Sequence, residues 1–288
     1  MINKIQKIIL LGFFISIALN FYYVSQFDKH DASVKDIKNY NEDQHMMIKS
    51  DPEKFWFRAH NLKIQLKNGV DYFETGEEYR VPYLPSKILY IFSVATNLKF
   101  YDQKTDEIIL EFFNGDLSKR KVTLGSKKVL FLIFQSLLYY LSIFFLYSKI
   151  KNKLDSRSSL YLIIFLSLEP TILLFHSSFW SESIFFTLLI FSIALIFENK
   201  ISISRNLLIG LLLGLLFLQR SVAIYYILIL IIYYFFIFKK KSAIPIFFIL
   251  VGYLSVVLFL GFHNLQRSKN FYIQPTQAKD GFYVYIVP

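Results

Sequence analysis

The sequence predicts an all-α integral membrane protein, with about seven transmembrane helices and amphipathic juxtamembrane helices in a long first outer loop. The chain of 288 residues is 55% hydrophobic, with a mean hydropathy of +0.43. Apolar runs suited to a hydrocarbon core of about 30 Å recur along it. The short loops between these runs are basic. Together these features set the chain apart from ordinary soluble proteins.

The apolar runs define the expected spans. Most approach or exceed roughly 18 residues, and the shortest needs its flanks to cross. The runs are residues 8–27, 129–147, 160–175, 183–197, 207–218, 222–238 and 243–262. The first run follows Lys4 and Lys7, so it is either a cleaved signal or an uncleaved anchor. We favour the anchor, because no small-x-small site follows and the run is long for a signal peptide.

The net charge of +11 raises the question of a nucleic-acid partner. Residues 28–121 contain 15 basic and 16 acidic residues, so 17 basic and only 5 acidic residues belong to the rest of the chain. The positive excess therefore flanks the spans, which indicates a bilayer partner and no nucleic acid. The absence of cysteine excludes disulfides, thiol catalysis and zinc-thiolate sites.

The basic residues in the short loops predict the topology, because short loops rich in lysine and arginine usually stay in the cytoplasm. This assigns residues 149–157, 198–205 and 239–241 to the cytoplasm, together with the N-terminus. The resulting organisation is a first anchor helix (1–27), an outer loop with juxtamembrane helices (28–126), a six-helix transmembrane bundle (127–262) and an outer C-terminal tail (263–288). The turns 176–183 and 219–220 also fall outside.

Two segments of the outer loop are expected to be helical. Residues 80–97 are apolar enough to cross, but a crossing would move the basic segment 149–157 outside, so we interpret them as a re-entrant or surface-lying helix. Residues 51–69 begin with Asp-Pro-Glu and end at Gly, which is typical helix punctuation. There Phe55, Ala59, Leu62 and Leu66 share one face, and we expect this helix to lie on the outer leaflet.

Two acids on the outer side are candidates for chemistry. Glu182 lies in the turn HSSFWSES, where the alternative is a solvated residue or a favourable charge at a helix start. Asp51 is equally well explained as an N-cap. Two carboxylates that converge at an interface can share general-base work and the positioning of substrate or metal. If a divalent cation binds, Asp51 and Glu182 are its candidate ligands.

Cations on the same side are Arg80, Lys87 and Arg220. An arginine at the membrane boundary usually has a partner, and its planar fork matches phosphate oxygens; the alternative for Arg220 is snorkelling to headgroups. Glu169, next to Pro170, is expected to make a structural polar contact.

For His176 and His263 we favour structural roles, because they are too far apart in sequence to form a metal motif. Nucleotide-binding loops and protease or hydrolase motifs are absent from the sequence.

Four stretches, in order, give the chain a resemblance to a known family. They are DPEKFWFRA, YRVPYLPSKILY, EPTILLFHSSFWSESIFFTLLIF and LLIGLLLGLLFLQR, within residues 5–240. This pattern resembles the GT-C superfamily of integral-membrane glycosyltransferases, which use polyprenyl-phosphate sugars and include protein O-mannosyltransferases and lipid A aminoarabinose transferases. The chain departs from the family in having Glu182 where Asp is more frequent, and a long outer loop before Asp51. Family members usually continue beyond seven spans, so a truncated chain is one interpretation.

The resemblance implies a function and roles. Asp51 and Glu182 would be the two catalytic acids, and Arg80 and Arg220, with Lys87 nearby, would bind the donor phosphate. The enzyme would move a sugar from a polyprenyl-phosphate donor to a protein, lipid or glycan acceptor, with inversion, at the outer face of a bacterial inner membrane. The alternatives are a non-enzymatic transporter, a flippase or a polysaccharide-assembly protein, and, as a second enzymatic class, a polysaccharide polymerase or ligase.

Overall fold

A computed structural model describes the part of the chain that forms the apolar helices. The described residues are 4–29, 55, 59, 62, 83–98, 126–198, 202–268, 271 and 273. Asp51, Arg80, Leu66 and most of the predicted outer loop and C-terminal tail lie outside these residues.

The described residues are mainly helical and contain no strand. The helices are α1 (Lys4–Lys29), α3 (Tyr83–Thr96), α5 (Ser126–Ile150), α6 (Ser156–Leu168), α7 (Pro170–His176), α8 (Ser181–Ile196), α9 (Ile203–Gln219), α10 (Ala223–Phe238), the 3-10 turn η7 (Lys239–Lys241) and α11 (Ala243–Ser268). The all-α class is therefore confirmed for this part of the chain. The last helix runs past residue 262, where the sequence placed the start of the tail.

Several of these helices could cross a membrane, which is consistent with a multi-pass membrane protein. By length and composition four are suitable: α1, α5, α10 with its extension into η7, and α11. The pair α6 and α7, bent by 44°, gives a fifth if it acts as one span. Helices α8 and α9 are apolar but shorter, with 16 and 17 residues. Each predicted apolar run thus falls in helix, while the number of crossings stays a prediction.

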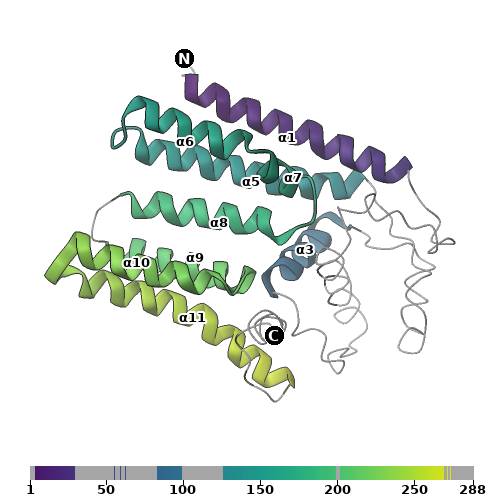
Figure 1. Cartoon of the computed structure of the whole chain (residues 1–288). Helices are drawn as coiled ribbons and strands as arrows, with labels where there is room; N and C mark the ends of the chain where they lie inside the picture. Colours follow the sequence, from purple (N-terminus) through teal and green to yellow (C-terminus); the bar gives the residue numbers. More distant parts are fainter. Residues whose placement is uncertain are drawn as a thin grey trace, which may run out of the picture.

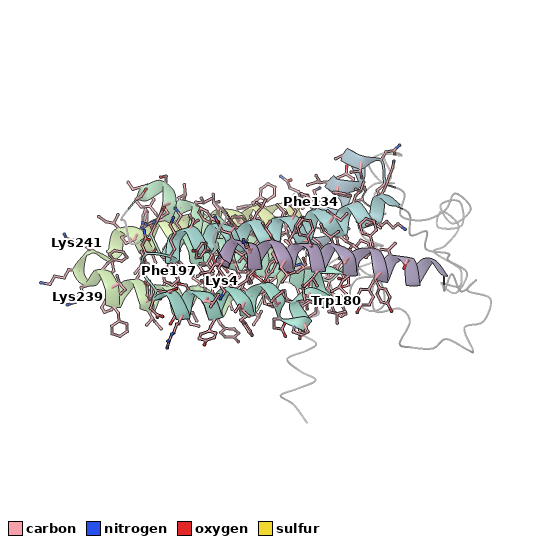
Figure 2. The ribbon with its side chains drawn as sticks, turned by 90° about the horizontal axis from the view of Figure 1, so that it is seen from above. Lys4, Phe134, Trp180, Phe197, Lys239 and Lys241 are labelled. Carbon is pink, nitrogen blue, oxygen red and sulfur yellow. The ribbon has the colours of Figure 1, made fainter. Side chains whose placement is uncertain are left out.

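The long helices lie side by side, from α1 at one edge to α11 at the other (Figure 1). One end of the bundle holds the start of α1, the turn 151–155, the end of α8 and η7; we call it the basic end. The opposite end holds α3 and the turns 177–180 and 220–222, and we call it the α3 end. Figure 2 shows the same separation, with Lys239 and Lys241 far from Trp180.

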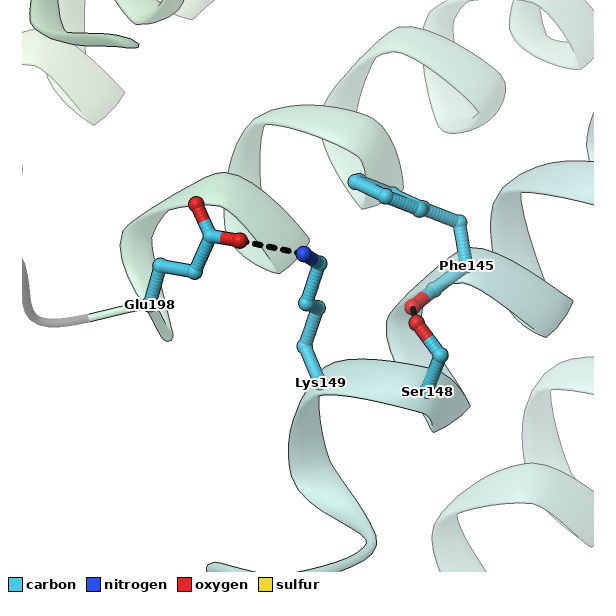
Figure 3. A network of polar contacts seen from close by, with 4 residues as sticks. All are labelled: Phe145, Ser148, Lys149 and Glu198. Carbon is cyan, nitrogen blue, oxygen red and sulfur yellow. Dashed lines mark hydrogen bonds and ion pairs between the residues drawn. The ribbon is translucent and has the colours of Figure 1, made fainter.

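An ion pair ties two helices together at the basic end. Lys149, in the last turn of α5, pairs with Glu198, just after α8 (Figure 3). The Lys149 ammonium also lies 4.9 Å from the centre of the Phe145 ring. Since α5 and α8 pack along each other, this pair fixes which ends of the two helices meet.

Helix α3 has Pro85 in its first turn and ends before Asn97, which has a φ of 52°. Its 14 residues reach only about 21 Å, which is shorter than a hydrocarbon core. It packs against α5 and α9 at the α3 end. Helix α3 is therefore short for a simple span, and the re-entrant or surface-lying placement of residues 80–97 stays a prediction.

The described residues of the segment after Asp51 are buried. Phe55, Ala59 and Leu62 are helical, as their spacing predicts, but they are 1%, 0% and 5% exposed. Phe55 and Ala59 belong to a buried cluster with Leu89 of α3 and Phe179. These three side chains therefore pack against protein, while the contact of the helix with the outer leaflet stays a prediction.

Glycines allow α9 and α11 to approach closely. A Cβ at Gly210 of α9 would lie 2.1 Å from the carbonyl oxygen of Ile249, and one at Gly252 of α11 would lie 2.4 Å from that of Leu207. At Gly214 a Cβ would lie 2.6 Å from Val256 Cβ. Small residues at i and i+4 are a common way to bring membrane helices together. The glycines in GLLLG therefore define the α9–α11 contact.

Replacing Gly210 by Ala is expected to destabilise the protein. In an ordinary helix this change stabilises by about 0.5–1 kcal/mol, because glycine costs backbone entropy. Here the new methyl group would clash with backbone of α11, and we expect a net loss of about 1–3 kcal/mol. Thermal unfolding of the purified chain in detergent would measure it, with Leu208→Ala, at an exposed position of α9, as the control. An unchanged or higher midpoint for Gly210→Ala would contradict the close contact.

Candidate functional site

An ion pair joins the start of α8 to the end of α9 at the α3 end. Glu182 Oε1 lies 2.7 Å from Arg220 Nη1. The second carboxylate oxygen, Oε2, accepts a hydrogen bond of 3.1 Å from the hydroxyl of Ser181. The Glu182 side chain is 10% exposed and that of Arg220 is 39% exposed. The carboxylate is thus enclosed by the bundle, while part of the guanidinium faces outward.

Both charges sit where their helices favour them. Glu182 is in the first turn of α8, and Arg220 is the C-cap of α9. The helix dipole stabilises an anion at an N-terminus and a cation at a C-terminus. Since α8 and α9 pack against each other in opposite directions, these two ends meet. The local sequence and the tertiary packing therefore favour the same pairing.

Side-chain amides from neighbouring helices hold the turn that leads into Glu182. Gln135 of α5 donates to the carbonyl oxygens of His176 (2.8 Å) and Ser178 (2.7 Å). Gln219 of α9 donates to that of Ser181 at 2.6 Å. Asn20 of α1, oriented to satisfy its hydrogen bonds, donates to the His176 carbonyl oxygen at 3.1 Å. Three helices thus fix the backbone next to the carboxylate.

His176 takes part in the same packing. Its Nδ1 lies 2.6 Å from the hydroxyl of Ser183 on α8, and its ring is 4.1 Å from that of Tyr139. The side chain is fully buried, and its Nε2 has no hydrogen-bond partner. His263 stacks on Phe259 instead, with the ring centres 6.2 Å apart. Both histidines fit the structural roles expected from the sequence.

Glu169 also has the structural role that its sequence context indicates. It ends α6 and begins α7, and its Oε2 accepts a hydrogen bond of 2.7 Å from the backbone N–H of Ile172. Pro170 follows as the first residue of α7, where its missing N–H costs nothing. The bend of 44° between the helices follows from this cap and proline.

The structure brings together part of the predicted site. Glu182 and Arg220 are in contact, whereas Asp51 and Arg80 lie outside the described residues. Lys87 is on α3, with its ammonium 5.2 Å from the centre of the Tyr90 ring. Within the described ranges, no three histidine or acidic residues gather as a metal site would require.

Gln135, Gln219 and Asn20 were missed in the sequence reasoning. The sequence does contain a signal for these three residues. An amide side chain inside an apolar run is costly unless it is hydrogen-bonded, so its presence there indicates a buried polar contact. Gln219 also keeps one buried oxygen, Oε1, without a partner, next to the ion pair in sequence.

Comparison with known proteins returned no match to a family model, to a curated protein sequence or to a solved structure.

Glu182 is less exposed than Arg220, so we expect the two substitutions that break this ion pair to lower the stability of the protein by different amounts. Arg220→Gln would leave a carboxylate enclosed without its counter-charge, for which we expect a loss of about 3 kcal/mol. Glu182→Gln would leave an arginine that can turn toward water, and we expect about 1 kcal/mol or less. Chemical or thermal unfolding in detergent checks the order. The double variant should be more stable than Arg220→Gln alone, and an additive loss would contradict the coupling.

Proposed function

We propose that the chain is a membrane glycosyltransferase, which moves a sugar from a polyprenyl-phosphate donor to an acceptor at the outer face of a bacterial inner membrane. The observation that supports it best is the Glu182–Arg220 ion pair at the α3 end, where the arginine is 39% exposed. This arrangement offers a fixed cation at the membrane boundary. The resemblance to the GT-C superfamily supplies the reaction.

In the proposed orientation the basic end faces the cytoplasm. The support is the distribution of charge, because the exposed Lys239–Lys241 and the basic turn after α5 share one end. Seven crossings then follow if the bent pair of α6 and α7 forms one span and α8 and α9 also span. At about 24–26 Å each, they need the polar residues at their ends to reach the interfaces.

Arg220 is proposed to bind the donor phosphate. A guanidinium has five N–H donors in a planar fork, and the contact with Glu182 is made by Nη1. Its remaining edge can hold phosphate oxygens while Glu182 keeps the group in place. Glu182 would also position the acceptor or a divalent cation, as the resemblance implies. Arg80 and Lys87 are proposed as further phosphate contacts.

Asp51 is proposed as the general base. Its own position is outside the described residues, but Phe55, about one helical turn later in sequence, shares a buried cluster with Phe179. Phe179 comes three residues before Glu182. Phe55 and Ala59 therefore pack at the same end of the bundle as the ion pair, which supports convergence of the two acids.

The proposed reaction is one displacement. An acceptor hydroxyl or amine attacks the sugar C1 from the face opposite the phosphate while Asp51 takes its proton. The bond between C1 and the phosphate oxygen breaks, and polyprenyl phosphate leaves with its added negative charge held by Arg220, Arg80 or a divalent cation. A positioned base contributes about 10²–10⁴-fold to the rate.

The transporter alternative is favoured by the break between α6 and α7, because transporters often bind substrate at discontinuous helices. Against it, the Glu169 carboxylate is already used to cap α7. Among the described residues, Glu182, Arg220 and the exposed lysines, which remain for function, lie at the bundle ends.

Cysteine labelling tests the orientation, since the chain has no cysteine of its own. Val222→Cys, exposed in the turn after α9, should react with a membrane-impermeant maleimide on intact cells. Lys153→Cys, exposed in the turn after α5, should react only after the membrane is opened. Labelling of both from the same side would contradict the proposed topology.

Sugar transfer tests the function. Membranes that contain the full chain should move radiolabelled mannose or aminoarabinose from its polyprenyl phosphate, and Asp51→Asn should reduce the rate by about 10²–10⁴-fold. Glu182→Gln should also lower it. The control is Glu198→Gln, which removes the ion-paired acid at the opposite end.

Wild-type transfer by Asp51→Asn would remove the base assignment. A wild-type chain inactive with every such donor would favour the transporter.

A further inference from the structure

Arg205 at the basic end is a buried cation that has no acidic partner among the described residues. It is 7% exposed, and within that part of the chain none of Nε, Nη1 and Nη2 makes a hydrogen bond of close geometry. Arg220, by contrast, is far more exposed and is paired. An enclosed charge that nothing compensates is strongly destabilising, and ionisable residues inside membrane helices are generally functional.

The described residues around Arg205 add more donors and no negative charge. The neighbouring Asn206 is fully buried, and its Nδ2 also has no partner. Its Oδ1 accepts a hydrogen bond of 3.4 Å from the hydroxyl of Tyr234 on α10. The Tyr234 hydroxyl is also close enough to Arg205 to interact with the guanidinium electrostatically and by hydrogen bonding, but a neutral hydroxyl cannot balance its charge. The cluster therefore has unused N–H groups on two side chains.

The position of the cluster at the start of a helix is a second feature that favours a bound anion. Arg205 is in the first turn of α9, and Ser202, the N-cap, makes no side-chain capping bond. The first N–H groups of a helix and its dipole attract negative charge. At three residues from the cap, Arg205 lies about 4–5 Å along the helix axis from its start. This depth is within reach of groups at the membrane surface.

We propose that Arg205, Asn206 and the start of α9 form a binding site for a phosphate-bearing anion on the side of the membrane opposite the Glu182–Arg220 pair. Several oxygens on one anion would satisfy the arginine fork and the amide together. The source is either a phospholipid headgroup of the adjacent leaflet or a free phosphate group in solution. Lys239–Lys241, exposed at the same end, would raise the local concentration of either anion.

Thermal unfolding of the purified full chain in an uncharged, phosphate-free detergent tests the site. Phosphatidylglycerol should raise the wild-type midpoint by about 5 °C, since a ligand that binds only the folded state stabilises it. Diacylglycerol, with the same chains and no phosphate, should not. A shift with inorganic phosphate at matched ionic strength would identify a site for soluble phosphate, and a shift with the phospholipid alone would identify a headgroup site.

Variants decide whether Arg205 is responsible. Arg205→Gln should lose the shift, and without added anion it should unfold at no lower temperature than the wild type, because it removes an uncompensated charge. Lys240→Gln, which removes an exposed charge at the same end, should keep most of the shift. If Arg205→Gln fails to fold, Arg205→Lys decides, because it keeps the charge without the fork and should show a reduced shift.

Three results would overturn the site. They are a full shift in Arg205→Gln or Arg205→Lys, an equal shift with diacylglycerol, and no shift of the wild type with either phosphate source.

Discussion

A charge enclosed by apolar helices is stable only beside an opposite charge or aligned hydrogen-bond donors, and this constraint explains how the charged residues are arranged. Glu182 has Arg220 and a serine hydroxyl, and Lys149 has Glu198. Glu169, at a helix break, takes a backbone N–H. Arg205 departs from this rule among these residues, which is why a bound anion is the natural interpretation of its surroundings.

The two ion pairs have different consequences because their settings differ. Lys149 and Glu198 are both partly exposed, at 25% and 35%, so water competes with the pair and its contribution is small. At the other end, Glu182 is nearly enclosed, and amides from three helices fix the turn before it. The Glu182–Arg220 pair is therefore fixed in position by its surroundings. A guanidinium fixed in this way at the end of the bundle is suited to binding a phosphate.

The sequence predicted the helices well because apolar runs between basic turns leave few alternatives. It also placed Glu182 and Arg220 on one side, since the alternation of short loops determines which helix ends meet. It could not predict that the face of Phe55 and Ala59 is covered by protein, because the same spacing suits lipid or a neighbouring helix. Nor could it pair Gln135 with the 176–178 turn, because such contacts depend on helix rotation.

The geometry of Glu182 bears on which acid acts as the base in the proposed reaction. Both of its oxygens already accept a partner, from Arg220 and from Ser181. A base must approach the acceptor's proton within hydrogen-bond distance, so Glu182 would first have to give up one of these contacts. Breaking the contact with Arg220 would make the guanidinium available to the leaving phosphate. It would also release the guanidinium from its fixed position. The arrangement therefore favours Glu182 as the group that orients Arg220 and leaves proton transfer to a second carboxylate, the role proposed for Asp51.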